Sequence, residues 1–506
     1  MTDRYAIREG KLMYDTVETT GQPPPADRSR WIALVVLCVG MLMIVLDMTV
    51  VNVALPAIQE DLGFTQAGLA WVVNAYLIAF GGLLLLSGRL GDLISRRGIF
   101  LAGLAVFTVA SLVCGLAVNQ WMLIAARFVQ GVGGAMTSAV ILGMIVTMFP
   151  QPREQAKAIG VYAFVASAGG SVGLLAGGVL TQLINWHWIF FINLPIGVVT
   201  AVLAVRVLAK DKGIGFAGGA DVLGAALITG SLMLGVYTIV SPAAELGWTA
   251  ARTLILGALS VGLLVAFVVR EATAANPLVP LRIFRSRNVS GANLVQALMV
   301  AGMFAMLFLG VLYLQLVLHY DSLRTGVAFL PCTIVMGTLS VRYAERLISR
   351  FGARRLLLPG LVLIGSGLAL FARVPIDGNY WIDVLPSMIL LGLGCGVSFP
   401  ALMTLAMSDV EMSEAGLASG LVNTTAQVGA ALGLAVLATL SATHTAALSA
   451  AGASLPVALT GGYELGMLVG AGLVLVAVVV AVTVLRLERK SESAPSPALE
   501  AAYAEV

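Results

Sequence analysis

The sequence is short of charge. Of its 506 residues, only 11% are Asp, Glu, Lys or Arg, whereas 59% are hydrophobic. Soluble domains usually carry about 25% charged residues, so this chain does not have the surface of a soluble protein. A formal net charge of +3 is also too small to indicate nucleic acid as a partner. The composition therefore predicts a protein that crosses a membrane many times.

Residues that carry enzyme chemistry are scarce as well. The sequence holds three His and four Cys, and the cysteines lie in or beside apolar runs without CxxC or His-rich spacing. We interpret them as packing residues rather than as metal ligands or disulfide partners. There is no Walker loop, no HExxH motif and no Ser/His/Asp set. We expect no enzyme activity, no cofactor and no metal site.

Long apolar runs make up most of the remaining sequence. Fourteen runs of about 20 residues reach the length that crosses ~30 Å of hydrocarbon, so we predict fourteen membrane spans. The first 30 residues lack the apolar segment of a signal peptide, and the first span is expected to act as the insertion signal. The predicted spans are 31–54, 69–88, 99–118, 122–149, 157–183, 188–208, 220–240, 251–269, 291–318, 324–347, 356–373, 384–407, 415–441 and 463–485.

The basic residues set the orientation of these spans. Twenty-five of the 29 Lys and Arg lie at the termini or in the loops that share their side, whereas the opposite loops hold only Arg252, Arg324 and Arg373. Cytoplasmic loops carry the excess of basic residues, so both termini are expected in the cytoplasm. The loop with Asp409, Glu411 and Glu414 has acid and no base, which weighs little in this rule. We expect a multi-pass protein of the cell membrane.

An internal repeat divides the spans. Residues 88–98 and 345–355 form two short basic loops of similar sequence at an offset of 257. Both follow the second span of a six-span set if spans seven and eight are an insertion, and chance resemblance is the alternative. Repeat-built transporters place their substrate cavity between the repeats. The predicted divisions are a cytoplasmic tail 1–30, a six-helix bundle 31–208, a two-helix linker 209–290, a second bundle 291–485 and a cytoplasmic tail 486–506.

Two charges lie inside apolar spans. Asp47 is in the first span and Arg127 in the fourth. An ionised Asp at mid-membrane costs on the order of 3 kcal/mol on insertion scales, so both groups are expected to face one cavity. Burial and a nearby cation act in opposite directions on a carboxyl, so a change of conformation can switch its protonation. We predict proton coupling at this pair; a purely structural ion pair is the alternative.

Other polar groups within or beside the spans are predicted to line a substrate cavity. Amides and phenols in an apolar wall suit a small amphipathic ligand held by few hydrogen bonds. The predicted cavity residues are Asn52, Asn74, Tyr76, Gln130, Asn293, Gln296, Tyr313, Asn423 and Gln427.

A stripe of small residues marks the fifth span. Gly169, Gly173 and Gly177 recur at spacing four, which lets a neighbouring helix approach closely. Such a plane can slide or rock during transport, and static packing is the alternative.

Five segments share a common pattern with a known family: 46–56, 88–97, 127–134, 186–197 and 271–285. They resemble the major facilitator superfamily, and within it the fourteen-span drug:proton antiporters of the DHA2 type. The resemblance covers roughly residues 31–485. It implies an all-α membrane protein with two six-helix bundles and two extra transmembrane helices.

The same resemblance assigns a conformational latch to Gly88, Asp92, Arg96 and Arg97. A carboxylate at a helix end can bind another helix N-terminus and pair with guanidinium groups, which would bias the outward-open state. Retention of the loop inside the cell is the simpler role of Arg96 and Arg97.

Four positions depart from the family pattern. Leu174 replaces the Pro of a Gly-Pro pair, His187 replaces Arg, Ser349 replaces the Asp of the second loop, and Ala426 replaces an Arg. The Gly-Pro pair marks the family's antiporters, so Leu174 leaves an importer, or a lipid or metabolite carrier, as the alternative function.

The leading prediction is a monomeric exporter of small amphipathic drugs or antibiotics, driven by exchange with protons and surrounded by membrane lipid.

Overall fold

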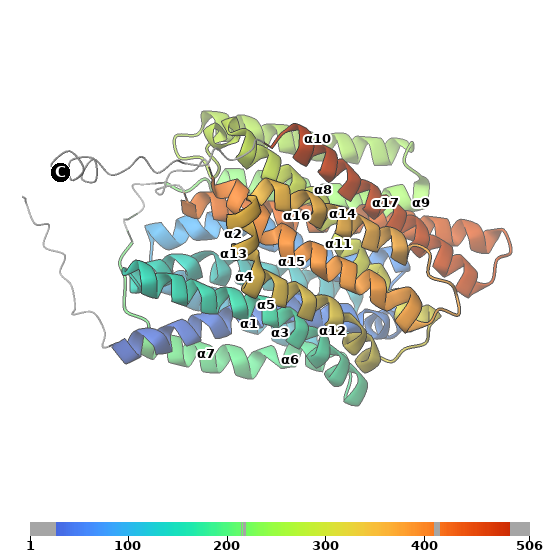
Figure 1. Cartoon of the computed structure of the whole chain (residues 1–506), viewed down its shortest axis with the longest axis horizontal. Helices are drawn as coiled ribbons and strands as arrows, with labels where there is room; N and C mark the ends of the chain where they lie inside the picture. The colour runs from blue at the N-terminus through green and yellow to red at the C-terminus, as the bar shows by residue number, and fades with distance from the viewer. Residues whose placement is uncertain (1–26, 214, 216–218, 409–414, 486–506) are drawn as a thin grey trace, which may run out of the picture.

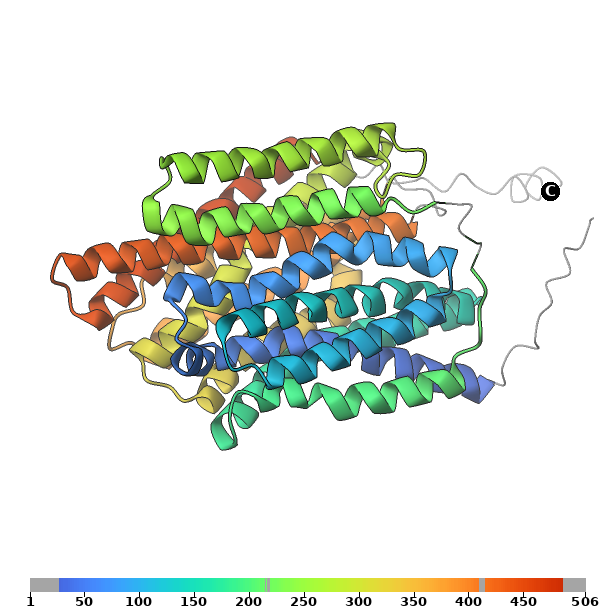
Figure 2. The same ribbon diagram turned by 180° about the vertical axis from the view of Figure 1, so that it is seen from behind.

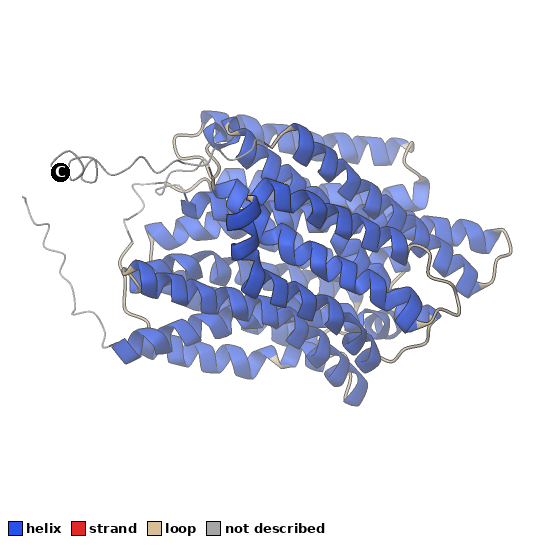
Figure 3. Ribbon diagram, viewed as in Figure 1, coloured by secondary structure: helices blue, strands red, loops and turns tan. Residues whose placement is uncertain are grey.

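The computed structural model describes residues 27–213, 215, 219–408 and 415–485, and within these residues the chain forms helices and loops but no strands (Figure 3). The α-helices of the first part are α1 (Asp27–Leu62), α2 (Gln66–Leu93), α3 (Arg96–Gly115), α4 (Gln120–Met148), α5 (Pro152–Leu183), α6 (Trp188–Phe191) and α7 (Asn193–Val207). They are followed by α8 (Val222–Thr238), α9 (Ala244–Leu246) and α10 (Ala251–Thr273).

The second part contains α11 (Arg287–Leu312), α12 (Ser322–Thr338), α13 (Ala344–Phe351), α14 (Ala353–Phe371), α15 (Leu385–Met407), α16 (Ala415–Ala450) and α17 (Leu455–Thr483). Short π-helical or 3-10 turns extend or join several helices: η2 (Ile239–Ala243), η3 (Leu281–Arg285), η4 (Tyr313–Val317), η5 (Leu339–Tyr343) and η6 (Tyr380–Val384).

The helices confirm the predicted fold class. Thirteen helical stretches among the described residues are long and apolar enough to cross a membrane, and α5 adds a helix of 32 residues with an apolar stretch at Ala168–Leu183. They follow the order of the fourteen predicted runs. The helices α1 and α16 have 36 residues each and are about 54 Å long, so they exceed the hydrocarbon thickness. The predicted run falls short of α1 at both ends and of α16 at its C-terminal end, because the more polar ends continue the same helix.

Three predicted segments fall wholly or largely outside the described residues. These are most of the N-terminal tail 1–30, the C-terminal tail 486–506, and the loop with Asp409, Glu411 and Glu414. Of the N-terminal tail, the described part already belongs to α1, which begins at Asp27.

Helices far apart in the sequence repeat the same neighbour relations. Helix α3 packs against α4 as α14 packs against α15, and α1 packs against α5 as α11 packs against α16. Helices α1 and α3 both contact α7, and α11 and α14 both contact α17. We call α1 to α7 the first half and α11 to α17 the second half.

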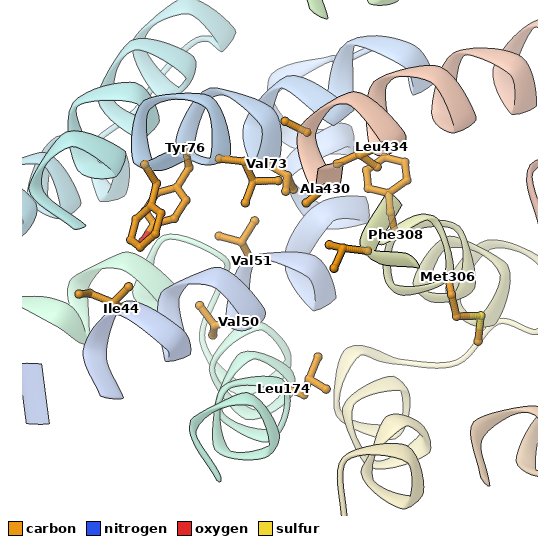
Figure 4. Close-up of a cluster of buried hydrophobic side chains, with 14 of the residues drawn as sticks. Ile44, Val50, Val51, Val73, Tyr76, Leu174, Met306, Phe308, Ala430 and Leu434 are labelled. Atoms are coloured by element: carbon orange, nitrogen blue, oxygen red, sulfur yellow. The ribbon is translucent and has the colours of Figure 1, made fainter. Parts of the chain in front are cut away.

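The halves meet mainly through two helix pairs, α2 with α16 and α5 with α12, and α1 adds smaller contacts with α11 and α12. Figure 4 shows part of this seam, where Val51 of α1 and Val73 of α2 lie near Ala430 and Leu434 of α16. The extra helices α8 and α10 lie side by side along one edge of the bundle (Figures 1 and 2). Helix α8 contacts both α2 and α16, whereas α10 packs against α8.

Along α5 the seam is closed at one end and open at the other, whereas α16 still reaches α2 near its start, where a Cβ on Gly420 would lie 2.8 Å from Leu85. We call the end where α1 begins the basic end. Far from it, a Cβ on Gly178 of α5 would lie 2.7 Å from the Ser322 carbonyl oxygen, so α5 and α12 touch there. Gly160 lies five full helical turns earlier on the same face of α5, and among the described residues no atom of another element lies within 4 Å of its Cβ position. Phe164 nearby is 57% exposed. The halves are therefore packed at the far end and apart along α5 at the basic end.

Candidate functional site

The two predicted mid-membrane charges form one buried ion pair. Arg127 of α4 donates from Nη1 to Oδ2 of Asp47 on α1 at 2.6 Å. The Asp47 side chain is 0% exposed and that of Arg127 is 1% exposed. Such a pair is sustained only when further hydrogen bonds satisfy both groups, because desolvating two charges is expensive.

Two amides complete the carboxylate site. Gln130 of α4 donates from Nε2 to Asp47 Oδ1 at 2.7 Å, and Asn193 of α7 donates from Nδ2 to the same oxygen at 3.1 Å. Ser111 of α3 accepts from Gln130 Nε2 at 2.8 Å and donates to the Phe107 carbonyl at 2.8 Å. The site therefore joins α1, α4 and α7 at one carboxylate and reaches α3 through the Gln130 amide.

The guanidinium is satisfied on several sides. Arg127 Nε donates to the Val72 carbonyl of α2 at 2.9 Å, and Nη1 also donates to Gln130 Oε1 at 2.7 Å. The Arg127 guanidinium carbon lies 4.5 Å from the ring centre of Tyr76 and 5.7 Å from that of Phe190. Cation–π contact and hydrogen bonding together stabilise the charge of this buried guanidinium.

The geometry corrects one part of the sequence-based expectation. Asp47 and Arg127 share one site, but in this conformation their side chains are 0% and 1% exposed, so bulk water does not reach them. Tyr76 and Phe190 cover the guanidinium, while Gln130 and Asn193 take up the carboxylate oxygen that water would otherwise hydrate. A proton can therefore reach Asp47 only after these neighbours move.

The predicted cavity amides and phenols are scattered. Asn52, Asn293 and Asn423 each donate to a carbonyl in their own helix, at 2.8 to 3.1 Å. Tyr313 lies far from the basic end and donates to the Pro375 carbonyl at 2.6 Å. Gln130 belongs to the Asp47 site.

The other four predicted cavity residues have unpaired polar atoms. Within the described residues no partner is found for the Tyr76 hydroxyl, for either amide atom of Asn74, or for Oε1 of Gln296 and Gln427. Gln427 lies at the seam, because a Cβ on Gly81 would lie 2.8 Å from the Gln427 Cβ.

Three of the four predicted latch residues, Asp92, Arg96 and Arg97, line a cavity of about 690 Å³ at the basic end. Arg96 pairs with Asp92 at 2.9 Å and donates to the Gly143 carbonyl of α4 at 3.1 Å. Asp211, which sequence reasoning missed, accepts from the Ser95 hydroxyl at 2.6 Å and from the Arg96 backbone N–H at 2.6 Å. A Cβ on Gly88 would approach Ala139 of α4 at 3.8 Å. All of these partners belong to the first half or to the segment that follows it, so these bonds do not require a closed seam.

The internal repeat extends to single contacts. Arg97, at the start of α3, donates to the Val205 carbonyl near the end of α7. Arg354, 257 residues later at the start of α14, donates to the Val482 carbonyl near the end of α17. Equivalent arginines thus join α3 to α7 in the first half and α14 to α17 in the second half.

The glycine stripe of α5 lies inside the first half. Cβ atoms on Gly169 and Gly177 would meet Val45 and Val50 of α1, and one on Gly173 would collide with Thr49. The face that meets the second half instead contains Leu174, whose carbonyl oxygen lies 2.5 Å from a Cβ placed on Gly326. The position that departs from the family's Gly-Pro pair is therefore a seam position.

Sequence reasoning assigned no role to Asn193 or Ser111. Asn193 is a polar residue within an apolar span and lies in segment 186–197, so its place in the sequence was a usable signal. Ser111 is a small residue in an apolar run, and the sequence gave no signal that it belongs to the site.

Two similar helical halves, membrane-length helices and a buried ion pair define a polytopic transporter of small molecules rather than an enzyme. Residues 37–434 match the model of the Major Facilitator Superfamily, and the chain belongs to that family.

Several relatives are named for antibiotic resistance or export. The puromycin resistance protein pur8 of Streptomyces alboniger is 41% identical over 83% of this chain and 84% of its own length. The cephamycin export protein CmcT of Amycolatopsis lactamdurans is 38% identical over 82% of this chain and 85% of its own length. The resemblance to fourteen-span drug exporters is thereby confirmed.

Solved structures share the fold. A bacterial homolog of the human lysosomal transporter Spinster, inward-facing and unoccupied, gives a TM-score of 0.63 at 16% identity, covering 91% of this chain and 97% of that one. At this identity the likeness shows the fold alone.

Proposed function

We propose that the protein exports small amphipathic compounds, antibiotics among them, across the plasma membrane in exchange for protons. The relatives named for puromycin resistance and cephamycin export support the substrate class. The observation that carries proton exchange is the buried Asp47–Arg127 pair, because Asp47 is a titratable group at a junction of four helices.

In this proposal the carboxylate couples protonation to helix packing. While Asp47 is ionised, Arg127, Gln130 and Asn193 hold α1, α4 and α7 together. A proton on Asp47 removes the ionic attraction and one acceptor site, so these helices can separate and admit water. Asp47 takes up its proton from the outer side and releases it to the cytoplasm, and substrate leaves in exchange.

The orientation belongs to the same proposal. We place the basic end and both termini in the cytoplasm, as the basic loops favour. The bundles are 31–208 and 291–485, the linker with two extra helices is 209–290, and the protein acts as a monomer in membrane lipid. The seam that is open at Gly160 then faces the cytoplasm, which is an inward-open arrangement.

We assign the latch to Gly88, Asp92, Arg96 and Arg97. Asp92 and Arg96 hold the loop to α4 in the present arrangement, and the loop meets the second half when the cytoplasmic end shuts. Close packing of Gly169, Gly173 and Gly177 on α1 provides the surface along which α5 rocks.

Everted vesicles test the proposal. Respiration acidifies the vesicle lumen, and adding a dye or antibiotic outside should release protons from the lumen as the compound enters. Asp47→Asn should abolish this release, whereas Asp61→Asn on the same helix should retain it. Full proton release by Asp47→Asn would show that Asp47 is not the proton carrier. Uptake without proton release in the wild type would rule out antiport and favour the alternative carrier functions.

A further inference from the structure

The two amides on the Asp47 carboxylate differ in how firmly they are held. Gln130 is fixed at both ends: its Nε2 bonds Asp47 and Ser111, while its Oε1 accepts from Arg127 at 2.7 Å and faces the Cys114 thiol at 3.5 Å. Turning this amide would point its NH₂ group at the guanidinium, where two donors would repel each other. Gln130 therefore stays a donor to Asp47.

Asn193 is held on one side only. Its Nδ2 bond to Asp47 is the longer of the two, at 3.1 Å, and its contact with Ser111 is 3.5 Å. Its Oδ1 is buried and has no hydrogen-bond partner among the described residues. A buried carbonyl oxygen without a donor is costly, by roughly 1–3 kcal/mol, and such an exception indicates a group that is used in another state.

We propose that Asn193 is a positioning residue that changes from hydrogen-bond donor to acceptor when Asp47 binds its proton. The inference rests on the proposed proton exchange. On the ionised carboxylate, Nδ2 donates to Oδ1 of Asp47. When a proton from water binds that oxygen, the carboxylic O–H needs an acceptor, and a half turn of the amide presents Asn193 Oδ1. Loss of the proton to water reverses the turn.

The turn needs no change in the backbone, because it is a rotation about the Cβ–Cγ bond of Asn193, the first residue of α7. Within the described residues, no other acidic side chain forms a hydrogen bond in this site. The hydrogen-bonding side chains around Asp47 and Asn193 are Arg127, Gln130 and Ser111. Asn193 is thus the group at Asp47 that can serve both protonation states.

Infrared difference spectra of the reconstituted protein, titrated over pH, test this role. The carboxyl C=O band of protonated Asp47 is identified by its loss in Asp47→Asn. In Asn193→Leu, which keeps the volume, the ionised form loses a donor and the acid loses an acceptor. The hydrogen bond to the charged form is the stronger of the two, so the band should still appear with a midpoint that is higher, by up to about one pH unit. The band should also move to higher frequency, because the acid loses its acceptor. Thr200→Val, on the same buried face of α7, should change neither.

Unchanged midpoint and frequency in Asn193→Leu, with the Asp47 band present, would overturn this role but leave proton exchange intact. A spectrum and proton release unaffected by Asp47→Asn would instead overturn the proposed function. Where Asn193→Leu does not fold, Ser111→Ala provides the second variant. It releases both amides and should shift the midpoint in the same direction, and no shift there would also overturn the role.

Discussion

The two halves share one plan of helix contacts and are held together differently. In the first half a buried carboxylate, a guanidinium and two amides join α1, α3, α4 and α7. In the described part of the second half no ion pair is found, and one neutral hydrogen bond of 2.9 Å joins Thr425 of α16 to Asn293 of α11. There α16 rests on α11 through backbone contacts, with a Cβ on Gly433 colliding with Ala301.

The difference indicates a division of labour on one repeated scaffold. The titratable chemistry is concentrated in the first half, whereas close apolar packing dominates the second. The two basic loops differ in the same way. Ser95 and Asp211 cap the start of α3 after the first loop, whereas α14 starts after Gly352 of the second loop without a side-chain cap. Breaking polar contacts should therefore harm the first half more than the second.

The largest contrast is expected at the ion pair. Arg127→Met leaves Asp47 as an uncompensated buried charge and should lower the free energy of unfolding by about 3–5 kcal/mol. Thr425→Val removes one neutral hydrogen bond in the second half and should cost about 1 kcal/mol. Thermal unfolding of the detergent-solubilised variants measures both. Equal losses would remove the distinction between the halves, and Asp47→Asn combined with Arg127→Met should recover part of the larger loss.

A smaller contrast is expected between the loops. Asp211→Ala removes the acceptor that faces the first backbone N–H groups of α3 and should cost about 1 kcal/mol. Ser349→Ala in the second loop removes only a bond to the Arg346 carbonyl of its own helix and should stay within about 0.5 kcal/mol. The same unfolding assay applies, and a loss at Ser349 as large as that at Asp211 would contradict the contrast.

The smallest effect is expected at His187, at the far end of the first half. Burial lowers the pKa of its imidazole, and the carboxylate of Asp61, 3.9 Å away, partly offsets this. The unfolded chain then binds more protons near pH 6 than the folded one, so stability falls as pH drops through about 6.5. His187→Gln should match the wild type at pH 8 and lose less stability at pH 5.5, by under about 0.5 kcal/mol because the side chain is 31% exposed. Equal losses in both proteins would show that His187 does not contribute to this pH dependence.

The sequence by itself determined the membrane helices, their order and the family, because apolar length and local motifs are properties of contiguous residues. It also singled out Asp47 and Arg127, since a charge in an apolar run is expensive wherever the helix is placed. Only the tertiary structure decided that Asn193 and Ser111 complete their site and that Asp211 caps α3, because these partners come from helices and loops distant in sequence. It also decided that the glycine stripe faces α1 rather than the second half, since the packing of the helices, and not their periodicity, selects the neighbour of each face.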